Sequence, residues 1–306
     1  MIEIIEKTTN SSIKKLHLIK PRTWVNAYKP NESEIKRIHK TTKAQLDFLR
    51  AALDEAERPR IERENNQLLV ILRVPIRDEI IKTIPLGIII KDDYFITIST
   101  QKIPIIEEFF KGKVKRFSTR KKSRLLIQLL VRITREFIRY LTKIEDEIDL
   151  TEEKLNRTLK NEDIIKLLKH EKTLVYFNTA ILSNSSVIER IAKGRIIKLY
   201  EEDEDVLDDV IIDNKQAAEM TRIFTDILSH TTDAYASLIN NNLNIIMKFL
   251  TAITIILSIP TIISSYYGMN VRLPLQQNPQ AFWIIIFLSI IISTILAWFF
   301  TRKDWL

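Results

Sequence analysis

A row of polar side chains lies near the C-terminal end of the sequence, where charge is almost absent. Residues 249–271 and 273–301 contain no formally charged side chain, and Gly268, Met269 and Asn270 lie where the two runs meet. Polar or soft side chains precede this tripeptide at steps of three or four residues: Asn244, Met247, Thr251, Thr254, Ser258, Thr261 and Ser265. This spacing places them on one face of a helix, where neutral oxygens can accept hydrogen bonds from the water around a cation.

The element that carries this polar stripe, defined by the seven residues above, is predicted to span a membrane. Each uncharged run exceeds the roughly 20 residues that a helix needs to cross a bilayer core, so the sequence predicts two spans. A polar stripe gains nothing from contact with lipid tails, and two interpretations remain open. Either the stripe packs against another helix, or it forms the wall of a hydrated pathway.

The order of motifs around the two spans is specific. Tyr267, Gly268, Met269 and Asn270 close the first span, and a short loop, a second span and a basic end from Arg302 follow. With these residues, and with segments 53–62, 143–149, 224–228 and 233–235, the sequence resembles the CorA-type divalent-cation transporters from about Leu53 onward. The resemblance implies a funnel-shaped homopentamer that carries Mg²⁺, with Co²⁺ and Ni²⁺ as further candidate ions.

The resemblance also implies which residues meet the ion. Gly268, Met269 and Asn270 would form the external selection site. Gly268 would allow the turn, and Asn270 would supply an amide oxygen to the hydrated ion. The family's pore-lining positions match Asn244, Met247, Leu250, Thr254, Ser258 and Thr261. Leu250 lies one residue away from Thr251 of the stripe, so the choice between these two stays open. Met247 and Leu250 form either a hydrophobic gate or an ordinary packing contact.

An acidic block precedes the first span and offers a second type of ion site. Its candidate regulatory residues are Asp205, Asp208, Asp209 and Asp213, which could bind Mg²⁺ between subunits and hold them closed. Asp209 lies at the family's regulatory-site spacing before Asn244, and Asp54 is a candidate partner from the N-terminal part. The alternative is a solvated acidic helix start, which the helix dipole favours. Mg²⁺ is expected as transported and regulatory ion, and no cofactor is expected.

Composition argues against several other classes of protein. The net charge is +8, but the basic cluster near residues 111–124 and the acidic block are separate and carry no nucleic-acid recognition motif. We therefore expect no nucleic-acid partner, and a basic cluster that is solvated or lies near anionic lipid or an acidic neighbour. The four glycines are isolated and no nucleophile with a base is recognisable, which argues against an enzyme and against a nucleotide-driven pump.

The predicted fold class is an α/β cytoplasmic N-terminal domain followed by long helices, which form a stalk, and two C-terminal transmembrane helices. The boundaries are an α/β domain at 1–118, long cytoplasmic helices at 119–204, and a stalk helix at 205–267 whose membrane part begins at about 246. The tripeptide and external loop cover 268–280, the second span covers 281–301, and a basic tail covers 302–306.

Individual elements follow from periodicity and capping residues. Strands are predicted at 1–5, 13–19, 67–75, 83–90 and 94–100, with Asp92 and Asp93 in a turn. A helix at 32–58, capped by Asn31 or Ser33, would end at Pro59, and a short helix would cover 105–110. Long helices are predicted at 119–157, at 161–194 and from about 206 to 259, where Pro260 would kink the last helix without ending it.

The orientation follows from the basic residues at the ends of the spans. Lys248 precedes the first span and Arg302 with Lys303 follows the second, which predicts both chain ends on the cytoplasmic side of the cell membrane. A zinc transporter of the same superfamily is the first alternative, although His17, His39, His170 and His230 are scattered and none lies in a span. A membrane-anchored oligomeric scaffold is the second alternative, and it leaves the tripeptide unexplained.

Overall fold

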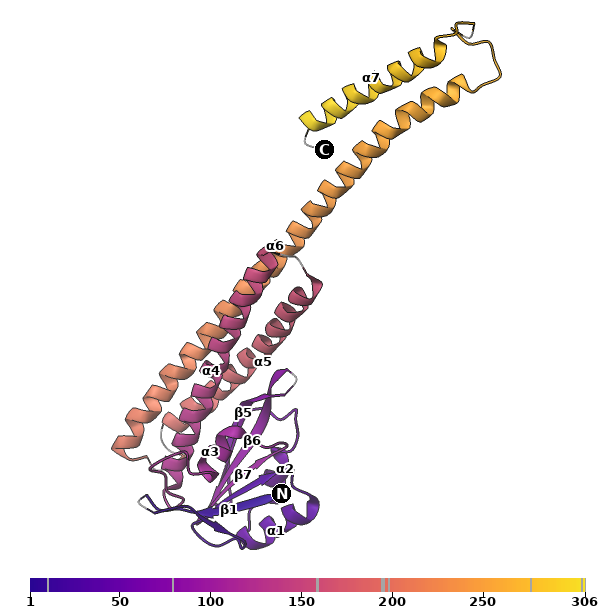
Figure 1. Cartoon of the computed structure of the whole chain (residues 1–306). Coiled ribbons are helices and arrows are strands. Elements are labelled where there is room, and N and C mark those ends of the chain that lie inside the picture. The colour runs from indigo at the N-terminus through magenta and orange to yellow at the C-terminus, as the bar shows by residue number, and fades with distance from the viewer. Residues whose placement is uncertain are drawn as a thin grey trace. The chain divides into compact units, whose positions relative to one another are not determined.

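The computed structural model describes the chain except for residues 10, 79, 158, 159, 194, 195, 198, 276, 304 and 306 and the side chains of 156, 157 and 201. The chain forms two compact units, Met1–Ser229 and His230–Leu306 (Figure 1). One helix, α6 (Glu201–Tyr267), contributes residues to both units. Each unit is described separately below.

A seven-stranded sheet forms the centre of the first unit, in the order β2-β1-β3-β7-β6-β5-β4. The strands are β1 (Ile2–Glu6), β2 (Lys14–Leu16), β3 (Trp24–Tyr28), β4 (Arg60–Glu64), β5 (Gln67–Arg77), β6 (Ile81–Lys91) and β7 (Tyr94–Ser99). Only β3 and β7 pair in parallel within the described sheet, and the other neighbours are antiparallel. The long β5–β6 hairpin pairs from Gln67 with Lys91 to Arg77 with Ile81.

Helices cover both faces of this hairpin, which explains its continuous apolar sequence. Leu69 and Ile71 join a core cluster with residues of α1 (Glu32–Thr42) and α2 (Leu46–Ala51). Val70 and Leu72 point to the opposite face by strand alternation and are equally buried. Helix α5 (Asn161–Ala192) contacts β5 and β6, and Asn184 of α5 hydrogen-bonds both backbone groups of Arg73.

A second part of the core is aromatic. Trp24 makes edge-to-face contacts with Phe95, Phe109, Phe110 and Phe117, at ring-centroid distances from 5.0 to 6.2 Å. Two of these partners lie on α3 (Pro104–Phe110), the short helix that was predicted at 105–110. These contacts join β3 and β7, in the middle of the sheet, to α3, which in turn contacts the first long helix, α4 (Lys122–Arg157).

The three long helices agree with the sequence prediction. Helix α4 (Lys122–Arg157) and α5 pack against each other, with Phe137 and Phe177 at a centroid distance of 5.0 Å. Helix α6 is 67 residues long and contains Pro260, so this proline does not end it. The predicted strands at 67–75, 83–90 and 94–100 are also confirmed, with the turn at Asp92, whose φ is 45°.

The prediction of one helix at 32–58 was wrong. Asn31 caps α1 as expected, because the Glu34 backbone N–H donates to its side chain at 2.8 Å, but α1 ends at Thr42. Lys43 adopts a left-handed conformation with φ of 58° and its N–H bonds to the His39 carbonyl, which closes the helix. A second helix, α2, then ends at Ala51, well before Pro59.

Two strands were not predicted. β3 is only five residues long and is buried in the sheet beside β7. β4 lies at the edge of the sheet and is polar, with Arg, Ile, Glu, Arg and Glu in sequence, so its composition is not typical of a strand. Pairing with the apolar β5 gives β4 its structure, and such a tertiary contact leaves little local signal.

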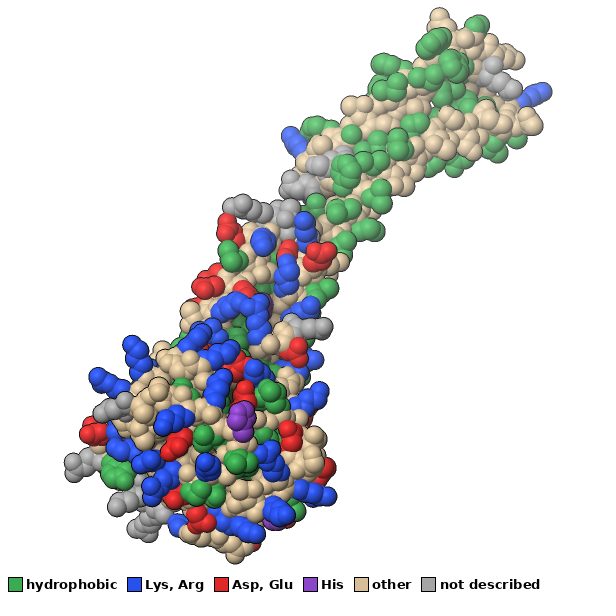
Figure 2. Space-filling view, turned by 60° about the horizontal axis from the view of Figure 1, so that its bottom comes forward, with side chains coloured by type: hydrophobic (Ala, Val, Ile, Leu, Met, Phe, Trp, Pro, Cys, Tyr) green, Lys and Arg blue, Asp and Glu red, His purple; other side chains and the backbone are tan. Residues whose placement is uncertain are grey.

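The second unit contains the C-terminal half of α6 and the helix α7 (Ala281–Arg302). Both carry segments long and apolar enough to cross a membrane, and little of either segment is buried within this chain. Hydrophobic side chains are abundant on the visible surface of this unit (Figure 2). Exposed apolar helices of this length are suited to a lipid environment and to contacts with further copies.

Candidate ion pathway

Helix α7 covers one face of α6. Ala252 of α6 is fully buried, and Ser289 of α7 is almost so. Ser293 of α7 donates its hydroxyl to the carbonyl of Ile256 on α6, with an O···O distance of 3.4 Å. Ala252 and Ile256 are one helical turn apart, so they mark the face of α6 that lies against α7.

Pro260 explains why the Ile256 carbonyl needs a partner. In a regular helix this carbonyl accepts the N–H of the residue four positions later, and proline has no N–H. The Ser293 hydroxyl supplies the missing donor from the neighbouring helix. A proline can therefore remain inside the predicted span, because a side chain satisfies the backbone group that it frees.

The polar stripe lies on the other side of α6. At about 100° per residue, Thr254, Ser258 and Thr261 are roughly opposite Ala252. Thr251, Thr254 and Thr261 are exposed, in contrast to Ala252. This chain therefore leaves the stripe uncovered, and either a second copy or water can meet it.

Three hydroxyls of the stripe have a defined orientation. Thr254, Ser258 and Thr261 donate to the carbonyls four residues earlier, at O···O distances of 2.7, 2.7 and 3.2 Å. Each hydroxyl proton is thus directed at the helix backbone, and the oxygen lone pairs remain for other partners. The stripe presents hydrogen-bond acceptors to whatever lies beside it.

The N-terminal part of the stripe is less polar. Asn244 is exposed, and Met247 and Leu250 have 58% and 55% of their surface exposed. Thr251 is exposed as well, so the structure of one chain does not separate it from Leu250. Two long apolar side chains at consecutive turns could narrow a path by excluding water.

The tripeptide directly follows the end of α6. The Gly268 N–H bonds to the carbonyls of Ser264 and Ser265, and the Met269 N–H bonds to that of Tyr266. Gly268 is not in the left-handed region, and an added Cβ would lie 3.4 Å from the Ser264 oxygen. The turn itself therefore does not require glycine in this chain, in contrast to the expectation from sequence.

Asn270 is exposed, and its side chain has no hydrogen-bond partner among the residues that the structure describes. In the following loop, Asn278 is different, because its side-chain oxygen accepts the Gln280 N–H at 2.9 Å. The amide of Asn270 is thus available to a ligand, whereas that of Asn278 serves the local turn. Arg272 is the single formal charge in this loop.

The acidic candidates lie near the start of α6. Asp205, Asp208 and Asp209 are exposed, and Asp213 lies 4.0 Å from the Arg135 guanidinium. Asp54 follows α2 and accepts the Ala56 N–H at 2.9 Å. In the described part of this chain no three His, Cys, Asp or Glu side chains gather as a metal site. A regulatory site at these residues would need ligands from a neighbouring subunit.

Asp203 lies two residues before Asp205 in the same acidic run and is not among the residues that the sequence suggested as ligands, but it is buried. Its side chain is 3% exposed, and its Oδ2 atom has no hydrogen-bond partner in the described chain. The Arg124 guanidinium lies 3.7 Å from Asp203 Oδ1 and donates to Glu202 at 2.8 Å, which lowers the pKa of Glu202. The block thus also anchors the start of α6 to α4.

The sequence matches a known protein family over most of its length. A family model described as CorA-like Mg²⁺ transporter protein matches residues 22–303. The cobalt/magnesium transport protein CorA of Methanocaldococcus jannaschii is 33% identical over 293 residues, which cover 92% of this chain and 91% of that protein.

Solved structures give the same result at the level of the fold. The complete structure of the M. jannaschii CorA magnesium transporter matches with a TM-score of 0.86 and 31% identity, over 100% of this chain and 99% of that one. The cytoplasmic domain of ZntB from Vibrio parahaemolyticus matches 76% of this chain and 98% of its own with a TM-score of 0.57. The second likeness, at 13% identity, concerns the fold alone.

Proposed function

The chain belongs to the CorA-like Mg²⁺ transporter family, and from this premise we propose that it conducts Mg²⁺ into the cytoplasm as a channel-like homo-oligomer. The M. jannaschii relative is described as a cobalt/magnesium transport protein, so Co²⁺ is a second candidate ion. The observation that carries the proposal is the uncovered polar stripe of α6, which faces away from α7 and leads to Asn270.

The pathway is formed by several copies of α6 around an axis, since two spans in one chain cannot enclose a pore. The resemblance implies five copies. Its lining consists of Asn244, Met247, Leu250 or Thr251, Thr254, Ser258 and Thr261. Most of this face is exposed in the single chain, which supports the assignment. A surface that contacts other subunits and water in an oligomer is uncovered in one copy.

The ion moves with much of its hydration shell. Mg²⁺ loses water reluctantly, and the proposed lining contains no carboxylate that could replace it. Hydroxyls that donate to their own backbone accept hydrogen bonds from the ion's water. At the outer end, the exposed amide of Asn270, which has no hydrogen-bond partner among the described residues, supplies an oxygen for the same purpose.

The membrane potential is sufficient as the driving force. With Lys248, Arg302 and Lys303 on the cytoplasmic side of the cell membrane, the loop with Asn270 lies outside. A potential of about 100 mV, negative inside, contributes about 4.6 kcal/mol to the inward movement of a divalent cation. This free energy corresponds to about three decades of accumulation, so no nucleotide is needed.

Cytoplasmic Mg²⁺ closes the pathway in this proposal. Asp205, Asp208 and Asp209 are exposed and can share an ion with a neighbouring subunit, with Asp213 and Asp54 as further candidate ligands. Without the ion, the carboxylates repel each other and the contact between neighbouring subunits at this site opens. Closure would act on α6, because the same helix carries the acidic block and the polar stripe.

The two alternatives have less support. The zinc alternative is not favoured, because the extensive similarity is to a cobalt/magnesium transporter and the likeness to ZntB concerns the fold alone. No histidine lies in either span of the sequence. A membrane-anchored scaffold would explain exposed apolar helices but not a row of oriented hydroxyls that leads to an unpaired Asn270.

The test is Mg²⁺ flux into liposomes that contain the purified protein, with an imposed inside-negative potential. Wild-type flux should rise with the potential, and Asn270→Ala should abolish most of it because the outer site loses its amide oxygen. Asn278→Ala is the matched control, since it removes an asparagine from the same loop whose side chain caps Gln280. The control should retain flux near the wild-type level.

Two results would contradict the proposal. Wild-type protein that is folded and oligomeric but passes neither Mg²⁺ nor Co²⁺ would favour the scaffold. Equal flux through wild type and Asn270→Ala would move the selection site away from the tripeptide. A parallel assay with Zn²⁺ distinguishes cargo, because flux of Zn²⁺ alone would restore the zinc alternative.

A further inference from the structure

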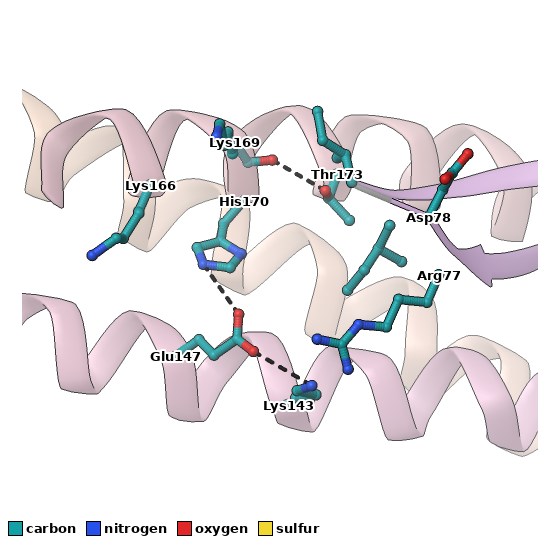
Figure 3. Close-up of a pocket in the computed structure, with 10 residues that line it drawn as sticks. Arg77, Asp78, Lys143, Glu147, Lys166, Lys169, His170 and Thr173 are labelled. Atoms are coloured by element: carbon teal, nitrogen blue, oxygen red, sulfur yellow. Dashed lines mark hydrogen bonds and ion pairs between the residues drawn. The ribbon is translucent and has the colours of Figure 1, made fainter. Parts of the chain in front are cut away.

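A hollow of about 210 Å³ lies in the first unit, between the tip of the β5–β6 hairpin and the helices α4 and α5 (Figure 3). Basic side chains dominate its lining. The four cations are Arg77, Lys143, Lys166 and Lys169, and the two carboxylates are Asp78 and Glu147. None of these residues belongs to the proposed ion pathway. Because basic side chains repel cations, the hollow is not a site for the transported ion.

The cations come from three different elements. Arg77 ends β5, Lys143 lies on α4, and Lys166 and Lys169 lie one turn apart on α5. Figure 3 shows Arg77 extending toward Lys143, across the space between the hairpin and α4. Folding thus brings together like charges that are far apart in sequence, which costs free energy unless a counter-charge joins them.

The carboxylates do not neutralise this group. Glu147 is shared, with one oxygen 3.6 Å from Lys143 Nζ and the other 3.4 Å from His170 Nε2. Lys166 pairs at 2.9 Å with Asp163, which lies outside the lining, and the Asp78 carboxylate is 2.9 Å from Lys82. The described side chains therefore offer no ion pair to either Arg77 or Lys169.

His170 lies at the wall of the hollow and pairs with Glu147. Its side chain is only 15% exposed, and burial lowers its pKa, an effect that Glu147 opposes but does not cancel. A neutral imidazole has a single N–H, and the Glu147 carboxylate beside Nε2 accepts it, so His170 leaves the binding of an anion to the basic side chains. Thr173 also lines the hollow, and its hydroxyl donates to the Lys169 carbonyl.

We propose that this hollow binds the phosphate groups of a small phosphorylated solute, with Arg77 and Lys169 as the principal ligands. A guanidinium pairs with phosphate oxygens through two parallel hydrogen bonds, and lysine adds a compact charge. The surplus of positive charge favours an anion with more than one charge. The volume is below the roughly 300 Å³ at which drug-sized pockets begin, so it accommodates one or two phosphate groups and not a whole nucleotide.

Binding would connect three elements of the first unit. A phosphate held by Arg77 and Lys169 bridges the end of β5 to α5, and Lys143 adds α4. The solute therefore rigidifies the junction between the sheet and the long helices. This inference is independent of ion conduction, because none of these residues belongs to the proposed pathway.

The experiment is isothermal titration of the full-length protein in detergent with pyrophosphate, at a fixed concentration of free Mg²⁺. Arg77→Gln and Lys169→Gln should each weaken binding about tenfold or more, the loss expected for one hydrogen bond to a charged group. Both side chains are exposed, so the substitutions should leave the fold intact. Glu147→Gln should have the opposite effect and strengthen binding, because it removes a negative charge from the hollow.

Lys172→Gln is the matched control, since Lys172 is an exposed lysine of α5, one turn from Lys169, and does not line the hollow. Its affinity for pyrophosphate should equal that of the wild type. No binding to the wild type, or equal losses in Lys169→Gln and Lys172→Gln, would overturn the proposal, the latter because it would indicate general attraction to basic surface. Weaker binding to Glu147→Gln would also contradict it.

Discussion

At the scale of single residues, Gly87 shows how closely the N-terminal sheet is packed. It lies in β6, opposite Ile71 and Ile98 of the neighbouring strands. A Cβ at this position would lie 2.4 Å from the Ala52 Cβ, at the end of α2, and 3.0 Å from Ile98 Cγ2. Both distances are shorter than ordinary contacts, so the absence of a side chain permits α2 to rest on the sheet.

We expect Gly87→Ala to destabilise the protein by about 1–3 kcal/mol, as overpacking of a filled core does. Thermal and denaturant unfolding of the full chain in detergent, followed by tryptophan fluorescence, measures the change. Ala52→Gly in the same chain should recover part of the loss, because it removes the nearer of the two atoms. A single substitution that leaves the unfolding midpoint unchanged would show that α2 moves away without cost.

At the scale of single elements, the length of α6 depends on a sequence free of helix-breaking residues and on a hydrogen bond from α7. The sequence from 206 to 259 contains no glycine or proline, and this made its length predictable. Pro260 does not end the helix, because Ser293 of α7 donates to the carbonyl that the proline leaves free. The pair therefore couples the proline of one span to a hydroxyl of the other.

A double-mutant cycle tests this coupling. Ser293→Ala should destabilise the wild-type protein by about 0.6 kcal/mol, a typical value for a hydrogen bond between membrane helices. In a Pro260→Ala background the same substitution should have almost no effect, since the alanine introduced there has a backbone N–H that satisfies the Ile256 carbonyl. The measurement is unfolding in mixed detergent micelles. Equal effects of Ser293→Ala in the two backgrounds would disprove the coupling.

Local patterns decided which elements could be predicted. The helices α4, α5 and α6 and the strands β5 to β7 follow from apolar periodicity and from runs of β-branched residues. The break after Thr42 did not follow, because Lys43 adopts a left-handed conformation usually reserved for Gly or Asn. The strand β4 was missed because its residues are polar and its partner β5 supplies the apolar contact.

The candidate site was predictable in part for a similar reason. The polar stripe is a helical repeat and can be read from spacing, but the face covered by α7 depends on a contact between helices 37 residues apart in sequence at Ser293 and Ile256. The basic hollow could not be predicted, since its cations come from β5, α4 and α5. The single chain does not distinguish Leu250 from Thr251 as the residue that lines the pathway, because both are exposed.

At the scale of the whole molecule, the single chain is incomplete with respect to its proposed function. Most of its polar stripe is uncovered, Asp205, Asp208 and Asp209 are exposed, and the described residues form no metal cluster. Assembly of copies around an axis would complete both sites at once. The proposed homo-oligomer therefore follows from function as well as from the resemblance to a known family.

Mg²⁺ at the cytoplasmic face should inhibit the current through inside-out membrane patches, and Asp209→Asn should weaken this inhibition. We expect the inhibitory concentration to rise about tenfold or more, at least the effect of changes in the outer shell of metal sites. Glu219→Gln is the control, because Glu219 lies on the same helix and pairs with Arg222. An unchanged inhibitory concentration in Asp209→Asn would assign the acidic block to helix solvation alone.

The hydroxyls of Thr254, Ser258 and Thr261 have a further consequence. Because their protons are directed at the helix backbone, these three side chains offer lone pairs to a passing solute but no donors. Anions such as chloride, which require donors, would find none on these three hydroxyls. Discrimination by sign of charge then depends on fixed dipoles, and the stripe has no titrating group. Such selectivity would persist across physiological pH and would not be screened as surface charge is.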